Sequence, residues 1–404
     1  MRSFDSQVRL FGILRFLNTF YVYNSILVFY FSNVIDLNYT QIGFVMASYY
    51  MTSILADIPT GMIGDLVGKK KAILIGSLLQ FSGIFLMGSL HSYLLLILAH
   101  IIFALGTSFI SGSEQGLIYK LHETHGKLDK LDRSYGKIFS ANILSTIVGA
   151  LLSSVVILYS YSFTFYISAF ANLLSALLVF LVYEEKTNVS QSRHIRPIRV
   201  IKESFREVRL NRQLLMFSVY YIFTAGILTS VFFQYQPFLQ QLNINPSFFG
   251  VAYALFGVIP LISSRMSHVI KGGFIFILNP LMLIFVFLGM ALTKSIWFGI
   301  VLVCLFRFNW GIIIPKTQTR IDTSISNEAS RVTTVSTIFS VHNIFLSIIL
   351  IVSGHLIEKY SLNLLLLIYS LLSLLFFVYT LIFRRVYKGN VSSESTLLMN
   401  AKEL

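Results

Sequence analysis

The stretch "DIPTGMIGDLVGKKK", residues Asp57–Lys71, joins two long apolar runs and gathers charges and glycines between them. Asp57, Gly61 and Asp65 are four residues apart, so a helix places them on one face. Gly68 allows a sharp turn because it has no Cβ, and three lysines follow it directly. The spacing predicts one helix that ends near Gly68 and a second helix that starts just after the turn.

The composition indicates a membrane protein. The chain has 404 residues, of which 55% are hydrophobic and only 12% are charged, whereas a soluble domain carries about 25% charged residues. Apolar runs of about 20 residues recur along the chain, and each is long enough to cross the hydrocarbon core of a bilayer. They are too long and too continuously apolar for barrel strands. The expected fold class is an all-α polytopic membrane protein.

The apolar runs predict twelve transmembrane helices arranged as two six-helix halves. The expected halves are residues 1–184 and 212–384, with a cytoplasmic central loop at 185–211 and a cytoplasmic tail at 385–404. The expected spans are 10–33, 41–64, 72–90, 93–119, 135–158, 161–183, 212–238, 247–268, 272–292, 295–315, 331–354 and 361–383.

The positive charges predict the topology. The net charge of +14 would suit a nucleic-acid partner, but nearly all of the 31 lysine and arginine residues fall in one set of connections and at both termini. Lys294 and Lys359 lie on the opposite side, and Arg15 and Arg307 lie within spans. The positive-inside rule therefore predicts a multi-pass protein of the plasma (inner) membrane with both termini in the cytoplasm and no nucleic-acid partner.

The sequence gives no sign of an enzyme. It has no phosphate-binding Walker loop, no Cys/His cluster with the spacing of a metal site, and no long soluble segment for a catalytic domain. The single cysteine, Cys304, lies inside an apolar run. We therefore expect no enzymatic activity, no cofactor and no bound metal.

Four stretches of the sequence carry a family resemblance. The stretch "GMIGDLVGKK", 61–70, is similar to the loop 2–3 signature of the major facilitator superfamily. The preceding "DIPTG", 57–61, and "SGSEQGLIYK", 111–120, resemble a bacterial drug-efflux-like branch, and "EASR", 328–331, is a weaker match. Span five has Gly149 but no proline, so it departs from the antiporter pattern.

The resemblance implies a secondary transporter that works by alternating access. We expect proton-coupled export of small amphiphilic or drug-like compounds, with a small-molecule substrate, protons and the lipid bilayer as partners, by a monomer. Three alternatives stay open: import of a nutrient, export of one metabolite, and a transport-inactive membrane sensor or scaffold. The intact 61–70 signature favours a protein that switches conformation.

The gating residues are expected around the loop signature. Asp65 should cap the positive N-terminus of a helix in the other half in one conformation only, and Arg331 is its expected cationic neighbour. Gly61 should let another helix approach closely. The full gating set is Asp57, Gly61, Asp65, Gly68, Lys69 and Arg331.

Proton coupling is expected at Glu114 or Asp57, the carboxylates in the inner halves of their spans; a purely structural tie between spans is the alternative. Arg15 is expected to snorkel to the nearby cytoplasmic end of span one. Arg307 needs a counter-ion, a wet cavity or an anionic substrate group. The expected cavity residues are Asn18, Tyr21, Ser111, Gln115, Arg307, His342 and Asn343; interhelical hydrogen bonding is the alternative.

The central loop has one periodic segment. Ile198, Ile201, Phe205 and Val208 recur at helical spacing with basic residues between them. This pattern predicts an amphipathic helix on the inner membrane surface, and a solvated basic linker is the alternative.

Overall fold

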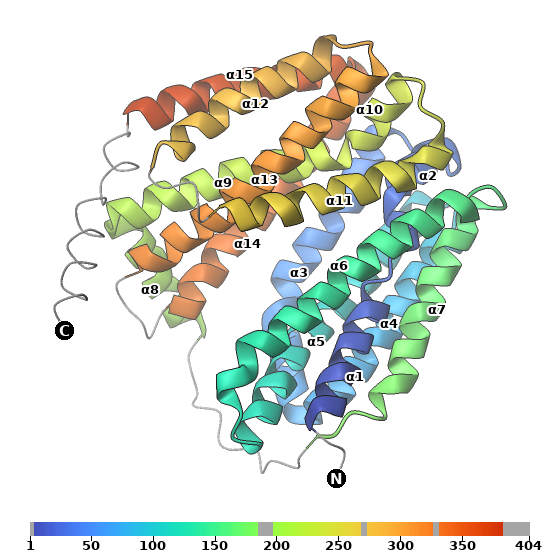
Figure 1. The fold of residues 1–404 in the computed structure, drawn as a ribbon, viewed down its shortest axis with the longest axis vertical. Coiled ribbons are helices and arrows are strands. Elements are labelled where there is room, and N and C mark those ends of the chain that lie inside the picture. Colours follow the sequence, from blue (N-terminus) through green and yellow to red (C-terminus); the bar gives the residue numbers. More distant parts are fainter. Residues whose placement is uncertain (1–3, 185–196, 268–272, 326–330, 383–404) are drawn as a thin grey trace. The chain divides into compact units, whose positions relative to one another are not determined.

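The computed structural model describes residues 4–184, 197–267, 273–325 and 331–382. Within these residues the chain forms fifteen α-helices and three short 3-10 helices (Figure 1). The expected tail at 385–404 and the first part of the central loop lie outside the described residues. Contacts group the described chain into two compact units.

The first unit contains helices α1 to α7 together with the segments 239–257 and 343–355. Within it α4 packs against α5 and α7, while α1 packs against α6 and α7. The helices are α1 (Phe4–Asn18), α2 (Leu27–Asn33), α3 (Tyr39–Val67), α4 (Lys69–Ser89), α5 (Tyr93–Thr124), α6 (Leu131–Val156) and α7 (Tyr161–Val179), with the 3-10 turns η1 (Val22–Ser25), η2 (Leu128–Lys130) and η3 (Pro246–Phe248).

Local sequence signals explain the ends of α3. Asn38 and Gln41 form a capping box at its start: the Gln41 backbone N–H donates to the Asn38 side chain at 2.8 Å, and the Asn38 N–H donates to the Gln41 side chain at 3.1 Å. At its end Gly68 adopts a φ of 97°, a left-handed value that favours glycine. The turn therefore separates α3 from α4, as the spacing predicts.

Close helix packing in the first unit depends on small residues. A Cβ added to Gly76 of α4 would lie 2.7 Å from the carbonyl oxygen of Gly106 on α5, so both positions require glycine. An apolar core surrounds α1, with Phe4, Phe11 and Ile118 buried in it. The core explains why α1 begins at Phe4 instead of at residue 10, where the apolar run alone placed the first span.

The second unit contains the described parts of 197–238, 258–342 and 356–382. In it α12 packs along α15 and α13, and α9 packs against α13 and α8 (Figure 1). The helices of the second half of the chain are α8 (Pro197–Leu210), α9 (Arg212–Phe233), α10 (Tyr235–Gln241), α11 (Phe249–Met266), α12 (Ile275–Leu292), α13 (Ile296–Ser324), α14 (Arg331–Lys359) and α15 (Leu362–Ile382).

Among the described residues, ten helices are long and apolar enough to cross a membrane. They correspond to expected spans three to twelve. Expected span one is interrupted between α1 and α2 by irregular backbone around η1, so neither piece has the required length. Expected span two is the long helix α3, which carries tyrosine, threonine, serine and aspartate residues and is not among these ten helices. The count of twelve spans stays a prediction.

The amphipathic segment of the central loop forms helix α8. Ser204 is buried, and Glu207 accepts a hydrogen bond from the Thr334 hydroxyl of α14 at 3.0 Å. Phe205 and Leu210 are exposed, and so is Arg209 between them. A hydrogen bond thus joins this helix to α14, and its exposed side chains include apolar and basic ones. Its location on a membrane surface stays a prediction.

Candidate functional site

The loop between α3 and α4 is held by two sets of charged contacts. Asp65 pairs with Lys69 across the turn at 2.8 Å, with the Asp65 side chain 62% exposed. The Glu184 carboxylate accepts the backbone N–H groups of Lys69 and Lys70 at 2.7 and 3.2 Å. Lys70 in turn donates to the carbonyl oxygens of Phe180 and Val182 at 2.9 and 2.8 Å. The start of α4 is therefore tied to the end of α7.

A glycine of the second motif makes room for this loop. The Lys69 side chain passes over Gly116 of α5, where an added Cβ would lie 2.8 Å from its terminal carbons. The motifs 61–70 and 111–120 thus meet in the fold at Lys69 and Gly116. The role of Asp65 as a helix cap in another conformation and the role of Arg331, which is exposed at the start of α14, stay predictions.

The contacts between α3 and α5 differ from the expectation at Gly61. No described heavy atom lies within 4 Å of a Cβ added to Gly61, whereas at Gly64 it would lie 2.9 Å from the Ser113 hydroxyl. Gly64 therefore allows the close approach to α5, because it lies on the face of α3 that is turned to that helix. Asp57 is exposed and accepts a hydrogen bond from Ser108 of α5 at 2.7 Å.

The main charged contact inside the first unit joins Arg15 of α1 to Glu114 of α5 as an ion pair. Glu114 is only 3% exposed. In this structure the Arg15 guanidinium pairs with Glu114, and snorkelling of Arg15 to the end of its span stays a prediction. Since α1 starts at Phe4, Arg15 lies about 17 Å along the helix from that end, at about 1.5 Å per residue.

A cavity of about 570 Å³ adjoins this pair. Its lining includes the charged residue Arg15 and the amide-bearing residues Gln115 and Asn142. The remaining lining residues come from α5 and α6 and are mostly apolar: Ile118, Tyr135, Gly136, Ile138 and Phe139. Of the expected cavity residues in the first unit, Gln115 lines this cavity, and Arg15 lines it without having been expected to.

Asn18 and Tyr21 take part in a hydrogen-bond network between helices. The Ser77 hydroxyl of α4 donates to Asn18 at 3.2 Å, and the Gln80 amide donates to the Tyr21 hydroxyl at 3.1 Å and to Thr107 at 3.0 Å. These contacts match the alternative of interhelical hydrogen bonding. Ser111 donates to the carbonyl oxygen of Ser108 in its own helix. Substrate contact at Asn18, Tyr21 and Ser111 stays a prediction.

In the second unit Arg307 of α13 lies between two aromatic rings. Its guanidinium carbon is 4.2 Å from the ring centre of Phe232 on α9 and 4.0 Å from that of Trp310. The rings attract the cation through their negative faces. His342 of α14 is buried with its ring 5.3 Å from that of Tyr221, and Asn343 is half-buried beside it in sequence. Substrate contact at Arg307, His342 and Asn343 stays a prediction.

The sequence did not reveal three of these interaction partners: Glu114 for Arg15, Trp310 for Arg307, and Glu184 for the loop after α3. An embedded cation such as Arg15 requires an embedded anion, and Glu114 is one of the two carboxylates that the sequence places inside spans. Trp310 is three residues from Arg307 on one helix face, which is a readable signal for a cation–π contact. Glu184 gave no sequence signal, because its partners are backbone N–H groups more than a hundred residues away.

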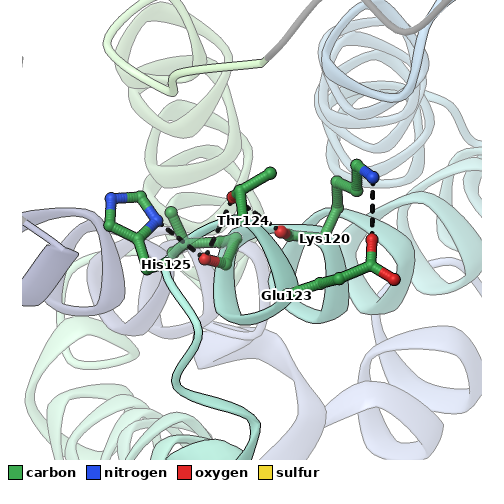
Figure 2. Close-up of polar contacts among 5 residues, drawn as sticks. Lys120, Glu123, Thr124 and His125 are labelled. Carbon is green, nitrogen blue, oxygen red and sulfur yellow. Dashed lines mark hydrogen bonds and ion pairs between the residues drawn. The ribbon is translucent and has the colours of Figure 1, made fainter.

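The C-terminal end of α5 carries a second carboxylate for comparison with Glu114. Glu123 is surface-exposed and pairs with Lys120 at 2.7 Å (Figure 2). Thr124 and His125 beside it contact only carbonyl oxygens of the same helix in that view (Figure 2). One helix thus holds a buried and an exposed carboxylate, each paired with a cation, about two and a half turns apart.

Sequence comparisons identify relatives that are described as transporters. A relative in Bacillus subtilis (strain 168), the uncharacterized MFS-type transporter YxaM, is 26% identical over 235 residues, which are 56% of this chain and 57% of that protein. An uncharacterized transporter of Buchnera aphidicola subsp. Schizaphis graminum (strain Sg) is 26% identical over 191 residues, 46% of this chain and 47% of its own length. The chain therefore matches about half the length of these relatives.

Solved structures share the fold at low identity. A mutant of the nucleoside transporter NupG matches with a TM-score of 0.79 at 15% identity, over 94% of this chain and 99% of that one. A POT family transporter in complex with 5-aminolevulinic acid matches with a TM-score of 0.74 at 12% identity, over 94% and 96%. The family model described as Major Facilitator Superfamily matches residues 10–341. This chain is therefore a member of the Major Facilitator Superfamily.

Proposed function

We propose that this membrane transporter exports small amphiphilic or drug-like compounds by alternating access and is driven by the proton gradient. It acts as a monomer in the plasma membrane, with both termini in the cytoplasm. The observation that carries the coupling part of the proposal is the buried Arg15–Glu114 ion pair beside a cavity. The resemblance of residues 57–61 and 111–120 to drug-efflux proteins supports the direction and the substrate class.

The ion pair provides a chemical basis for coupling. A proton-driven antiporter needs a group that is charged in one state and neutral in the other. When Glu114 is ionised, Arg15 is held to α5; when Glu114 is protonated, the Coulomb attraction is lost and the guanidinium can turn to another partner. Asp57 is exposed, so it serves the gate in this proposal and Glu114 carries the proton.

The loop after α3 serves the conformational change. Asp65, Gly68 and Lys69 form a turn whose position is set by Glu184 within the first unit. Because the Asp65 side chain is largely exposed, it is available to a further partner in another state. A transport-inactive sensor or scaffold has no need for such a contact, which is why the intact turn supports transport.

One alternative has specific support. The nucleoside transporter NupG and the POT family transporter share this fold, so import of a nutrient or export of a single metabolite competes with drug export. The two directions differ in one measurement. Cells with and without the protein are compared for accumulation of a diverse compound panel, with and without an uncoupler. Lower accumulation with the protein, abolished by the uncoupler, is expected; higher accumulation would favour import.

The coupling residue is tested with a substrate from that panel. Glu114→Gln keeps the shape of the side chain but cannot ionise, so it should abolish uphill transport while substrate binding and downhill exchange are retained. Glu123→Gln on the same helix removes an exposed carboxylate and should leave transport unchanged. Unchanged uphill transport by Glu114→Gln would remove Glu114 from the mechanism, and Arg307 and His342 would be tested next.

A further inference from the structure

We propose that the cavity between α1, α5 and α6 binds an organic anion, a compound with one acidic group on an apolar body, and that Arg15 is its charged ligand-binding residue. This inference rests on the proposed transport function, because it names the substrate class of the same pair. It changes the expectation for the cargo: an amphiphilic acid fits the cavity better than an amphiphilic cation.

The cavity has the size and lining of a small-molecule site. Its volume of about 570 Å³ falls within the range of about 300–1,000 Å³ that is usual for ligand pockets. Ile118, Ile138 and Phe139 offer an apolar wall for the body of a ligand. The amides of Gln115 and Asn142 offer donors and acceptors that do not select for charge. The selective group is therefore the single charged lining residue, Arg15.

The exposed fractions of the Arg15 and Glu114 side chains indicate which of the two a ligand in the cavity contacts. The Arg15 side chain is 28% exposed and lines the cavity, whereas the Glu114 side chain is 4% exposed and does not line it. A guanidinium has five N–H donors in a planar fork, and one carboxylate accepts from at most two of them in a bidentate pair. Arg15 can therefore hold Glu114 and present donors to the cavity.

The charge of the site selects against cations. A cationic ligand in the cavity would meet Arg15 and not its partner, because Arg15 lines the cavity whereas Glu114, 4% exposed, is not among the lining residues. A neutral ligand would gain only hydrogen bonds. An anionic ligand gains charge-assisted hydrogen bonds, which are about twice as strong as neutral ones. Such a ligand competes with Glu114 for the same guanidinium, so removing the charge of Glu114 should strengthen its binding.

The test uses purified full-length protein in neutral detergent and three probes of equal size: 1-naphthoate, neutral 1-naphthamide and cationic 1-naphthylmethylamine. Thermal unfolding is followed against probe concentration, because a ligand that binds the folded state raises the melting temperature. We expect naphthoate alone to raise it in a saturable way. Equal shifts from the amine or the amide, or none from naphthoate, would overturn the proposal.

Variants assign the effect to Arg15. Arg15→Gln should weaken naphthoate binding about tenfold or more, about the loss of one charge-assisted hydrogen bond. Arg15→Lys keeps the charge and should bind with intermediate affinity, which keeps the test valid if the glutamine variant does not fold. Lys137→Gln removes an exposed positive charge from α6 outside the cavity lining and should bind as the wild type does. Naphthoate binding that survives in both Arg15 variants would contradict the assignment.

Two further measurements distinguish this proposal from binding of an anionic lipid and from proton coupling at Glu114. Short-chain phosphatidylglycerol tests an anionic lipid as the source of the acidic group; stabilisation by that lipid without any effect of naphthoate would overturn the proposal. Glu114→Gln should bind naphthoate at least as tightly as the wild type does. Tight binding by this variant together with unchanged uphill transport would refute proton coupling at Glu114 but leave the anion site intact.

Discussion

Replacing Arg15 by glutamine should destabilise the protein by an amount that depends on pH. The substitution leaves the Glu114 carboxylate, which is 3% exposed, without its cation. Removing one partner of a buried ion pair costs about 3–5 kcal/mol. Glutamate can escape part of this cost by taking up a proton, because a neutral carboxyl group needs no counter-ion.

The loss of stability in Arg15→Gln can be estimated from the cost of protonating Glu114 in the folded variant. An unfolded glutamate has an ordinary pKa of about 4.3, and protonating it costs about 1.4 kcal/mol for each pH unit above that value. At pH 7 the penalty for Arg15→Gln should therefore be about 3–4 kcal/mol, and at pH 5 about 1 kcal/mol. The variant that holds a proton in the folded state loses stability as the pH rises, since its unfolded state binds fewer protons.

The assay is reversible unfolding in mixed micelles at pH 5, 6 and 7. The double variant Arg15→Gln/Glu114→Gln has no buried charge at these positions and should regain most of the stability at pH 7, so the two changes are not additive. Arg9→Gln is the matched control: it removes an exposed arginine from the same helix and should change the stability by no more than about 0.5 kcal/mol. A loss for Arg15→Gln that is independent of pH, or that simply adds to that of Glu114→Gln, would refute the reasoning.

Four further predictions concern the gate, the topology, the loop anchor and the surface helix. Asp65→Asn should cut transport strongly at normal expression levels, and transport at the wild-type rate would contradict its gating role. Reporter fusions after residues 186 and 404 should behave as cytoplasmic, and an external signal from either would overturn the topology. Glu184→Ala removes the acceptor for two backbone N–H groups and should lower stability by about 2 kcal/mol in thermal melts, with partial recovery in Glu184→Gln. Phe205→Trp should add fluorescence that brominated lipids quench in anionic vesicles, beyond the quenching of Trp297 and Trp310 in the wild type; no added quenching would favour a solvated helix.

The helices were predictable because membrane spans are long and apolar. Expected spans three to twelve coincide with helices, with differences mainly at the ends, where apolarity does not mark the last turn. Expected span one starts later than α1 because Phe4 and Val8 stand among polar residues, and both side chains are buried in the core. The residues between α1 and α2 contain no proline, so the sequence did not indicate the break.

Residues of the candidate site were predictable only where a short stretch of sequence carries the signal. Gly68 was readable from the turn it permits, and Glu114 from the rarity of a carboxylate within a span. Gly64, and not Gly61, packs against α5, because a four-residue spacing defines a face without saying which neighbour that face meets. The pairing of Arg15 with Glu114 joins residues about a hundred positions apart, and only the fold brings them together.

Proton movement tests the central proposal most directly. Purified protein is placed in vesicles that contain a pH-sensitive dye, and a transported compound from the panel is added in the absence of a proton gradient. For the wild type, protons should cross the membrane in the direction opposite to the compound, and Glu114→Gln should exchange the compound without moving protons. Net transport by the wild type without proton movement, or proton movement by Glu114→Gln equal to that of the wild type, would contradict the proposed coupling.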